Sequence, residues 1–199
     1  MKKNLFGTDG IRSLSNDEIF NNISLNTLAR SVLNNNKKLR IVIGRDTRES
    51  SKEIENNFIN ALKNNGATIF KVGLLSTPAI SYLTKKLNCN LGIVISASHN
   101  PYQFNGIKFF NKNGDKLSNL DEHKIEKDFF KLIKKKNIDK NNGTIQVIKD
   151  PFAVYKKKFR KILIKNNFSK RLKIVIDCAN GSSFQVAKYI FSKINVNSI

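Results

Sequence analysis

The chain has 199 residues, of which 40% are hydrophobic, so it is large enough to form one domain, or one domain and part of another. It contains 36 Lys and Arg against 15 Asp and Glu, and this formal net charge of +21 would by itself suggest nucleic acid or an anionic membrane as a partner. Lysine and asparagine are nevertheless spread along the whole chain, and lysine is dense only at residues 131–140 and 156–161. We therefore interpret the charge as a bias of composition, and we expect no specific nucleic-acid partner.

The two cysteines, Cys89 and Cys178, lie far apart in the sequence, so we expect neither a disulfide framework nor a zinc site. No apolar run approaches the roughly 20 residues that cross a bilayer. The first residues, Met-Lys-Lys, lead directly into Leu5-Phe6-Gly7 without the apolar core of a signal peptide. We expect a cytoplasmic protein with no membrane partner.

Apolar runs at 39–43 and 91–95 predict buried strands, the second of them buried on both faces, and residues 68–72 predict a further strand between them. The segments between them have apolar residues at helical spacing. Alternating strands and helices are typical of a largely parallel sheet that lies between helices. We expect residues 1–150 to form such an α/β domain, with a mixed, mostly parallel sheet sandwiched by helices.

Polar residues at the start of each predicted helix suggest how that helix is capped. Ser24 is expected to cap the first helix. Ser50 and Glu53 have the spacing of a capping box at the start of the second helix. Thr77 is expected to cap the third, with Pro78 at its first position.

The second half of the chain continues the pattern with a hairpin. Asn113-Gly114 predicts a type I′ turn between strands at 107–110 and 116–117. The remaining predicted elements are a helix at 120–136 with His123 on its exposed side, a strand at 144–148, a helix capped by Asp150 and Pro151, a strand at 172–176, a helix at 184–194 and the start of a strand at 195–199. We expect residues 151–199 to form a linking helix and the incomplete start of a second, similar α/β domain.

A reactive loop is predicted where the strand at 91–96 ends. The small and polar residues of Ser96-Ala-Ser-His-Asn-Pro101 follow its apolar run directly. In open α/β sheets ligands bind at the carboxyl ends of strands, which is where Ser96, Ser98, His99 and Asn100 would lie. Lys108 follows on a second short strand, within reach of the same crevice.

The loop after the first predicted strand, Gly44-Arg-Asp-Thr-Arg48, has two interpretations. It joins the carboxyl end of a strand to the amino end of a helix, a position that favours an anion. Arg45, Asp46 and Arg48 could equally form an internal salt-bridge cluster. An Arg-Asp-x-Arg pattern alone does not decide between them.

Five motifs occur together in a fixed order: Phe6-Gly-Thr-Asp-Gly-Ile-Arg12, Gly44-Arg-Asp-Thr-Arg48, Ser76-Thr-Pro78, Ser96-Ala-Ser-His-Asn-Pro101 with Asn105-Gly-Ile-Lys108, and Ile176-Asp-Cys-Ala-Asn-Gly181. In their order and spacing they closely resemble the α-D-phosphohexomutases, which move a phosphoryl group between positions 1 and 6 of a sugar phosphate. The resemblance extends from about Phe6 to the last residue, in a family whose chain is more than twice as long.

This resemblance implies that Ser98 carries a phosphoryl group and that Mg²⁺ binds an oxygen of that phosphoserine. Arg12 would hold the phosphoryl group in flight, although it could instead pair with Asp9 in its loop. Lys108 would transfer a proton or contact phosphate, and His99 would make a supporting polar contact.

Thr8, Ser96 and Asn100 are further candidates for binding the substrate or its phosphate. Ser96 is the nearest rival of Ser98 for the phosphoryl group, but its place at the strand end suggests a structural hydroxyl. The chain departs from the family at Ser13 and Ser51, where glycine is usual.

The sequence lacks the Asp-Gly-Asp-Gly-Asp-Arg run from which the family takes three metal ligands. The family's sugar-specificity and phosphate-clamp loops, which belong to its third and fourth domains, are missing too. We expect conversion between glucosamine 6-phosphate and glucosamine 1-phosphate through a hexosamine 1,6-bisphosphate, with little or no turnover unless a separate polypeptide supplies the missing domains. Glucose or mannose phosphates as substrates, or a basic binding module without catalysis, are the alternatives.

Overall fold

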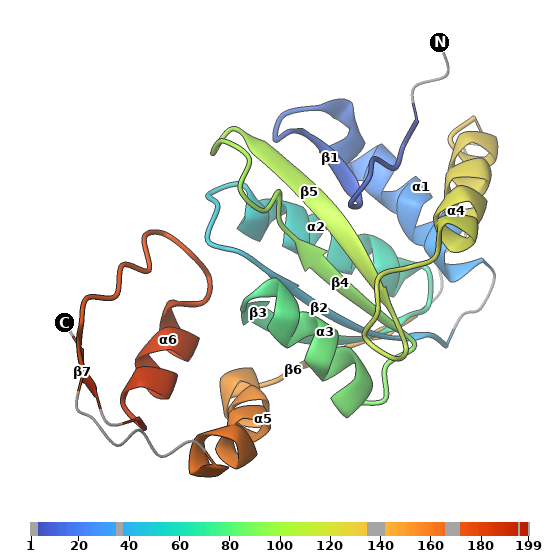
Figure 1. Cartoon of the computed structure of the whole chain (residues 1–199). Helices are drawn as coiled ribbons and strands as arrows, with labels where there is room; N and C mark the ends of the chain where they lie inside the picture. The colour runs from blue at the N-terminus through green and yellow to red at the C-terminus, as the bar shows by residue number, and fades with distance from the viewer. Residues whose placement is uncertain (1–3, 35–37, 135–141, 166–171, 195, 199) are drawn as a thin grey trace.

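The computed structural model describes residues 4–34, 38–134, 142–165, 172–194 and 196–198. Its centre is a six-stranded sheet with the strand order β1-β5-β4-β2-β3-β6 (Figure 1). The strands are β1 (Ile11–Leu14), β2 (Arg40–Arg45), β3 (Thr68–Leu74), β4 (Leu91–Ile95), β5 (Phe104–Asn111) and β6 (Thr144–Val147). Strands β4, β2, β3 and β6 are parallel, whereas β5 runs antiparallel to β4 and β1 antiparallel to β5. The predicted mixed, mostly parallel sheet is therefore confirmed.

Helices cover both faces of this sheet. One apolar cluster joins the sheet to α1 (Asn22–Leu33), α2 (Ser51–Asn64) and α4 (Asn119–Leu132), and the other joins it to α3 (Thr77–Lys86) and α5 (Pro151–Lys165). Successive residues of β2 alternate between the clusters, with Ile41 and Ile43 in the first and Val42 in the second. This alternation explains the continuous β-branched runs, because each strand must present apolar side chains on both faces.

Strand β1 was not predicted. Residues 6–12 suggested only a sharp turn, but Ile11 pairs with Ile107, and Arg12 pairs with Gly106 on β5. A short 3₁₀ helix, η1 (Glu18–Phe20), follows β1 and leads to α1. A four-residue strand is too short to show a clear alternation, so its pairing depends on contacts far away in the sequence.

The predicted caps of the first two helices are wrong. The side chain of Asn21, rather than that of Ser24, caps α1, and it accepts a hydrogen bond from the Ser24 backbone N–H at 2.8 Å. Ser50 and Glu53 form no capping box, because Ser50 makes no side-chain cap bond. Its hydroxyl instead accepts a hydrogen bond from the Asn105 amide at 2.8 Å, which ties the start of α2 to β5.

The start of α3 and the hairpin also differ in detail from the prediction. The residue that precedes α3 is Ser76, so Thr77 is the first helical residue and not the cap. In the hairpin only Gly114 has a positive φ, +84°, and a type I′ turn would require one at Asn113 as well. Lys116 makes a single bridge to β5 instead of forming a strand.

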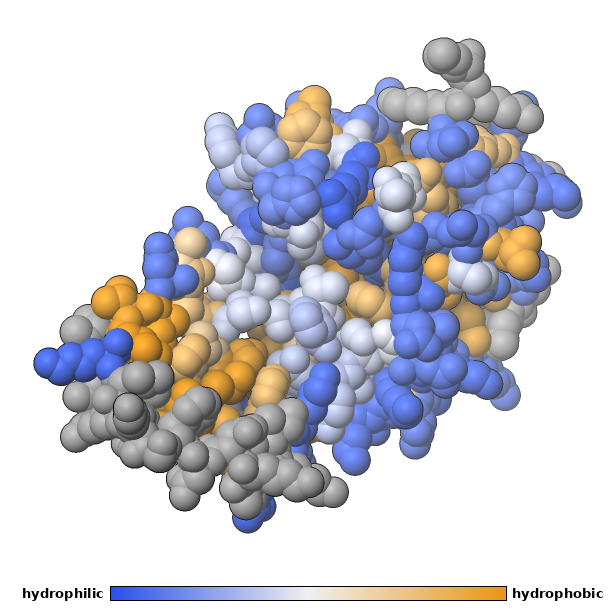
Figure 2. All heavy atoms as spheres, in the orientation of Figure 1, coloured by the Kyte–Doolittle hydropathy of each residue, from blue (hydrophilic) through white to orange (hydrophobic). Residues whose placement is uncertain are grey.

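The last described elements form a small parallel unit. Strand β7 (Leu172–Ile174) pairs with β8 (Val196–Ser198), and α6 (Phe184–Phe191) lies between them in sequence. No residue of α6 is buried, and Figure 2 shows hydrophobic side chains gathered over this part of the surface. Strand β7 and helix α6 are shorter than the predicted strand at 172–176 and helix at 184–194. The division of the chain into two domains near residue 150 stays a prediction.

Helix α4 ends at Leu132, short of the predicted residue 136. Some predictions concern residues that the structure does not describe: residues 135–136 of that helix, most of the lysine-rich run at 131–140, and residues 195 and 199 of the last strand. His123 is exposed, as predicted. Within the described ranges, no helix is both long and apolar enough to cross a bilayer.

Candidate active site

A crevice of about 1050 Å³ opens at the carboxyl ends of β2, β3 and β4. Residues of the loops that follow these three strands line it, together with residues of the turn that precedes α6. They include Asp46, Thr47 and Arg48; Ser76, Thr77 and Pro78; Ser96, Ser98, His99 and Asn100; and Asn180, Gly181, Ser182 and Ser183. Strands β2, β3 and β4 end at one edge of the sheet, so the three motifs that follow them meet in one place, and the turn before α6 brings the motif at 176–181 to the same crevice.

Ser98 lies exposed in the loop between β4 and β5. Its φ of +59° is in the left-handed region, which costs a residue other than glycine about 1–2 kcal/mol. Its hydroxyl oxygen is 3.4 Å from Nδ1 of His99. Ser96 is only 4% exposed and its hydroxyl accepts the Ser98 backbone N–H at 3.0 Å, so Ser96 supports the loop from beneath. This arrangement leaves Ser98 as the hydroxyl that a ligand can reach.

Arg48 binds the same loop from the loop that follows the neighbouring strand, β2. Its guanidinium donates to the carbonyl oxygens of Ser98, Asn100, Pro101 and Phe104 at 2.7–3.0 Å. Its Nε donates to a carboxylate oxygen of Asp46 at 3.1 Å. The internal salt bridge, one of the two interpretations of this motif, is thus present, and the four carbonyl contacts were not foreseen.

A buried polar network supports Arg48. Ser51 is fully buried, and its hydroxyl donates to Asp46 at 2.7 Å and accepts from the Asn105 amide at 3.0 Å. Asn105 also accepts the backbone N–H of Gly106 at 2.8 Å. Ser51, which stands where the family usually has glycine, therefore has a structural role. The Nε of Arg45 is not part of this network. It lies 3.4 Å from a carboxylate oxygen of Glu55 instead.

A second polar cluster lies beside the serine loop. One carboxylate oxygen of Asp9 is 2.5 Å from Nζ of Lys108 and 2.9 Å from Nη2 of Arg12. Nη1 of Arg12 donates to the side-chain oxygen of Asn100 at 3.0 Å. Partial burial would raise the pKa of Asp9, but the hydrogen bonds and charges of Lys108 and Arg12 outweigh it, so the pKa is lowered.

Most of the predicted site residues lie either in the serine loop that Arg48 binds or in the cluster of Asp9, Arg12 and Lys108 beside it. Arg12 pairs with Asp9, which was one of its two predicted roles, and it also reaches the serine loop through Asn100; its contact with a phosphoryl group stays a prediction. Asp9 was considered only as a partner of Arg12, and its contact with Lys108 spans 99 positions, which no local pattern could reveal. Thr8 does not line the crevice; it is exposed, and its carbonyl oxygen accepts Nζ of Lys116 at 2.7 Å.

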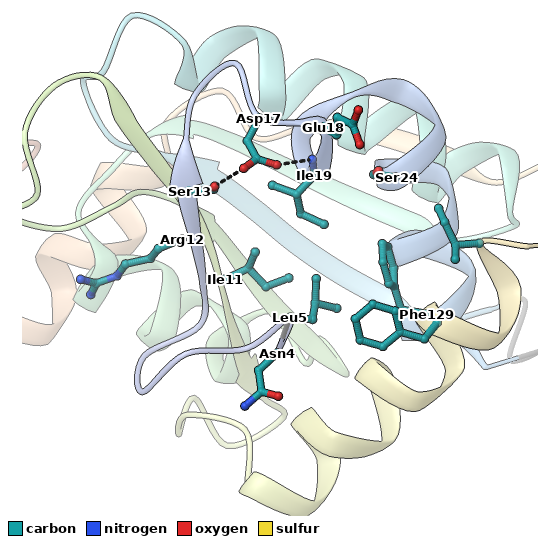
Figure 3. A pocket seen from close by; sticks show the side chains of 12 residues that line it. Asn4, Leu5, Ile11, Arg12, Ser13, Asp17, Glu18, Ile19, Ser24 and Phe129 are labelled. Carbon is teal, nitrogen blue, oxygen red and sulfur yellow. Dashed lines mark hydrogen bonds between the residues drawn. The ribbon is translucent and has the colours of Figure 1, made fainter. Parts of the chain in front are cut away.

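A smaller pocket of about 270 Å³ lies between β1, η1 and α4. Figure 3 shows Arg12 directed away from Leu5, Ile11 and Phe129, which line this pocket. The Ser13 hydroxyl, at the other position where glycine is usual, donates to Asp17 and so stabilises the turn that precedes η1. Arg12 is the only predicted site residue among the lining side chains.

Within the described residues, no group of three or more His, Cys, Asp or Glu side chains could hold a metal ion. Two carboxylates beside the serine loop are already engaged, Asp46 by Arg48 and Ser51, and Asp9 by Lys108 and Arg12. These residues do not fit a Mg²⁺ site of their own.

Comparison with known proteins agrees with the motifs. Residues 3–136 match the family described as phosphoglucomutase/phosphomannomutase, alpha/beta/alpha domain I. The chain is 41% identical over 201 residues to a phosphoglucosamine mutase from Nitratiruptor sp., covering 96% of this chain and 44% of the relative. It is 38% identical over 203 residues to a phosphoglucosamine mutase from Clostridioides difficile, covering 98% and 44%. The chain thus spans less than half the length of these curated relatives.

Solved structures share the fold. A phosphoglucomutase/phosphomannomutase family protein from Burkholderia thailandensis has a TM-score of 0.76 at 19% identity, covering 98% of this chain and 43% of the other. A protein described as a phosphomannomutase from Thermus thermophilus has a TM-score of 0.74 at 22% identity, covering 100% and 46%. The family match extends over most of the chain, and the resemblance to the phosphohexomutases is confirmed. The chain belongs to the phosphoglucomutase/phosphomannomutase family.

Proposed function

We propose that this chain is the phosphoserine-bearing part of a phosphoglucosamine mutase, and that Ser98 accepts a phosphoryl group from a hexosamine 1,6-bisphosphate. The observation that carries the proposal is the exposed Ser98 hydroxyl at the edge of the crevice, in a loop held on the underside by Ser96 and at the side by Arg48. The names of the curated relatives support the choice of glucosamine. The family description favours glucose and mannose phosphates as the second candidates.

The proposed reaction is a transfer between two hydroxyl oxygens. The bond between Ser98 Oγ and phosphorus breaks, a bond from phosphorus to a sugar hydroxyl forms, and the proton of that hydroxyl leaves to a nearby base. The resulting bisphosphate turns around and returns its other phosphoryl group to Ser98. Positioning and charge neutralisation contribute most of the catalysis in such transfers.

The polar groups near Ser98 suit these tasks. Arg12 has its guanidinium beside the loop, where it can bind phosphoryl oxygens, and Lys108 adds a second positive charge. His99 lies within 3.4 Å of the serine oxygen, so it can contact the serine or the sugar. Lys108 is the proposed group for proton transfer or for contact with a phosphate, and its Nζ lies 2.5 Å from the Asp9 carboxylate.

When bound, Mg²⁺ would neutralise charge on the phosphoserine. The described residues would contribute only the Ser98 phosphate oxygen, so the other ligands would come from outside them. Full turnover, as distinct from the loading of Ser98, is proposed to need groups beyond the 199 residues of this chain, which match 44% of a curated relative's length. The cytoplasmic location and the absence of a specific nucleic-acid partner stay predictions.

The test is intact-mass spectrometry with peptide mapping after incubation with glucosamine 1,6-bisphosphate and Mg²⁺. We expect one added phosphoryl group on Ser98 and none in Ser98→Ala, with Ser96→Ala as the matched control that still becomes labelled. Glucose 1,6-bisphosphate in parallel compares the two sugars. A folded chain without label on Ser98, or label that persists in Ser98→Ala, would overturn the proposal.

A further inference from the structure

The carbonyl oxygens of the serine loop converge on one side chain. Nη1 of Arg48 donates to the carbonyl oxygens of Pro101 at 2.7 Å and Phe104 at 3.0 Å. Nη2 donates to those of Ser98 at 2.9 Å and Asn100 at 2.7 Å. The Arg48 side chain is only 11% exposed, so water competes little for these bonds. A single guanidinium thus binds the loop on both sides of its turn.

This arrangement uses the whole donor capacity of the guanidinium. Arginine has five N–H donors in a planar fork. Four of them bind the loop carbonyls, and the fifth, on Nε, binds Asp46 at 3.1 Å. Asp46 is itself held by the Ser51 hydroxyl and by the Arg48 backbone N–H. Arg48 therefore has no donor left for a phosphate, although its motif favours an anion.

The contacts also orient the peptide that follows Ser98. In a trans peptide the N–H points opposite to the C=O. Because the Ser98 carbonyl points at Arg48, the N–H of His99 points away from Arg48. Among the described residues this N–H has no hydrogen-bond acceptor, and His99 lines the crevice. It is a donor that a phosphoryl group on Ser98 could use.

We propose that Arg48 is a positioning residue for phosphoryl transfer at Ser98. By binding four loop carbonyls it holds Ser98 in its left-handed conformation and directs the His99 N–H toward the phosphoryl group. The inference rests on the proposed function, but its effect on loop conformation can be measured without any transfer. Lysine cannot replace Arg48, because an ammonium group has three donors and no planar fork.

The first experiment measures hydrogen exchange by mass spectrometry in Arg48→Lys and in a matched control, Arg40→Lys. Arg40 also donates from its guanidinium to backbone carbonyls, those of Leu87 and Asn88, but at the opposite end of β2. We expect exchange in peptides that cover 97–104 to rise about tenfold in Arg48→Lys and to be unchanged in Arg40→Lys. Unchanged loop exchange in a folded Arg48→Lys would overturn the proposal, whether or not Ser98 can be phosphorylated.

The second experiment measures the rate of Ser98 labelling against bisphosphate concentration. Since misplacement of a reacting group by about 1 Å costs about 100-fold, we expect a loss of that order in the saturating rate of Arg48→Lys, with little change in the half-saturating concentration. We expect guanidinium ion, but not ammonium ion, to restore part of the rate in Arg48→Ala. If Arg48→Lys does not fold, Asp46→Asn is the second variant, because it removes the carboxylate oxygen that accepts the Arg48 Nε–H. We expect it to lower the saturating rate of labelling as well, but by a smaller factor. Equal losses in Arg40→Lys, or a folded Arg48→Lys that is labelled at the normal rate, would refute the positioning role.

Discussion

Gly106 is the residue of β5 where adding a methyl group should disturb the candidate site most directly. A Cβ atom built there would lie 2.6 Å from the carbonyl oxygen of Ile11 and 2.7 Å from that of Ser96. It would also lie 3.2 Å from Cγ of Arg12. The first two neighbours are backbone atoms of β1 and of the residue after β4, so neither can rotate out of the way. Gly106→Ala must therefore push apart the strands that carry Arg12 and the serine loop.

The magnitude follows from these contacts. Ordinary contacts of a Cβ atom begin near 3.4 Å, so both carbonyl groups have to retreat by several tenths of an ångström. Overpacking a well-packed core costs about 1–3 kcal/mol. The displaced Ser96 also weakens its backbone hydrogen bond to the Gly106 carbonyl, 2.9 Å long, which contributes about 1 kcal/mol. We expect Gly106→Ala to lower the free energy of unfolding by about 3 kcal/mol, roughly a 150-fold change in the unfolding equilibrium.

Urea denaturation followed by circular dichroism measures this change, since the chain has no tryptophan to report on unfolding. The matched control is Gly7→Ala, whose added Cβ would lie 3.6 Å from the nearest atom, an ordinary contact. We expect this variant to stay within about 0.5 kcal/mol of the unmodified chain. If Gly106→Ala were as stable as Gly7→Ala, the close approach of the three backbone segments would be refuted.

Three further predictions concern buried groups. Cys89 is 2% exposed, and burial raises its pKa to about 11. We therefore expect Cys89 to resist iodoacetamide until the chain unfolds, whereas Cys178, which is only partly buried, reacts in the folded state. Equal rates of alkylation of the two cysteines in the folded chain would contradict this. Burial raises the pKa of Glu55 above its ordinary 4.5, although nearby cations oppose the shift, so the folded state binds more protons than the unfolded chain between the two pKa values. The free energy of unfolding should therefore fall as the pH rises from 4.5 through the raised pKa, and urea titrations of Glu55→Gln should lose that slope. Asn105→Ala removes the hydrogen bonds that the Asn105 amide makes to the Ser50 and Ser51 hydroxyls and to the Gly106 backbone N–H. We expect it to lower the free energy of unfolding by about 3 kcal/mol. A loss below about 1 kcal/mol would contradict the structural role of these bonds.

Much of the fold could be predicted because its signals are local. Strands β2 and β4 are buried on both faces, so each contains a continuous apolar run that stands out in the sequence. The carboxyl ends of parallel strands meet at one edge, and this rule alone predicted that Ser96, Ser98, His99 and Asn100 would share one crevice. The helix caps were less predictable, because a serine hydroxyl such as that of Ser50 can bond to another strand instead of its own helix.

The antiparallel edge of the sheet could not be predicted in the same way. Arg12 pairs with Gly106, which lies 94 positions further along the chain, and the four residues of β1 are too few to show an alternating pattern. The same pairing brings Lys108 close to Asp9. A contact between two such distant side chains depends on the register of β1 against β5, and the sequence of either strand alone leaves that register open.

Arginines from two of the sequence motifs show why residue type alone cannot assign a role. Arg48 has all five donors bound, four of them by backbone carbonyls, which every residue possesses and which therefore leave no mark in the sequence. Arg12 uses one donor for Asn100 and one for Asp9, and its Nε has no hydrogen-bond partner among the described residues. A phosphoryl group can therefore be bound by Arg12 without breaking the serine loop, whereas binding it with Arg48 would release the carbonyls that hold Ser98 in place. The number of free donors, which only the folded chain reveals, separates the residue that can contact phosphate from the one that can only position the serine.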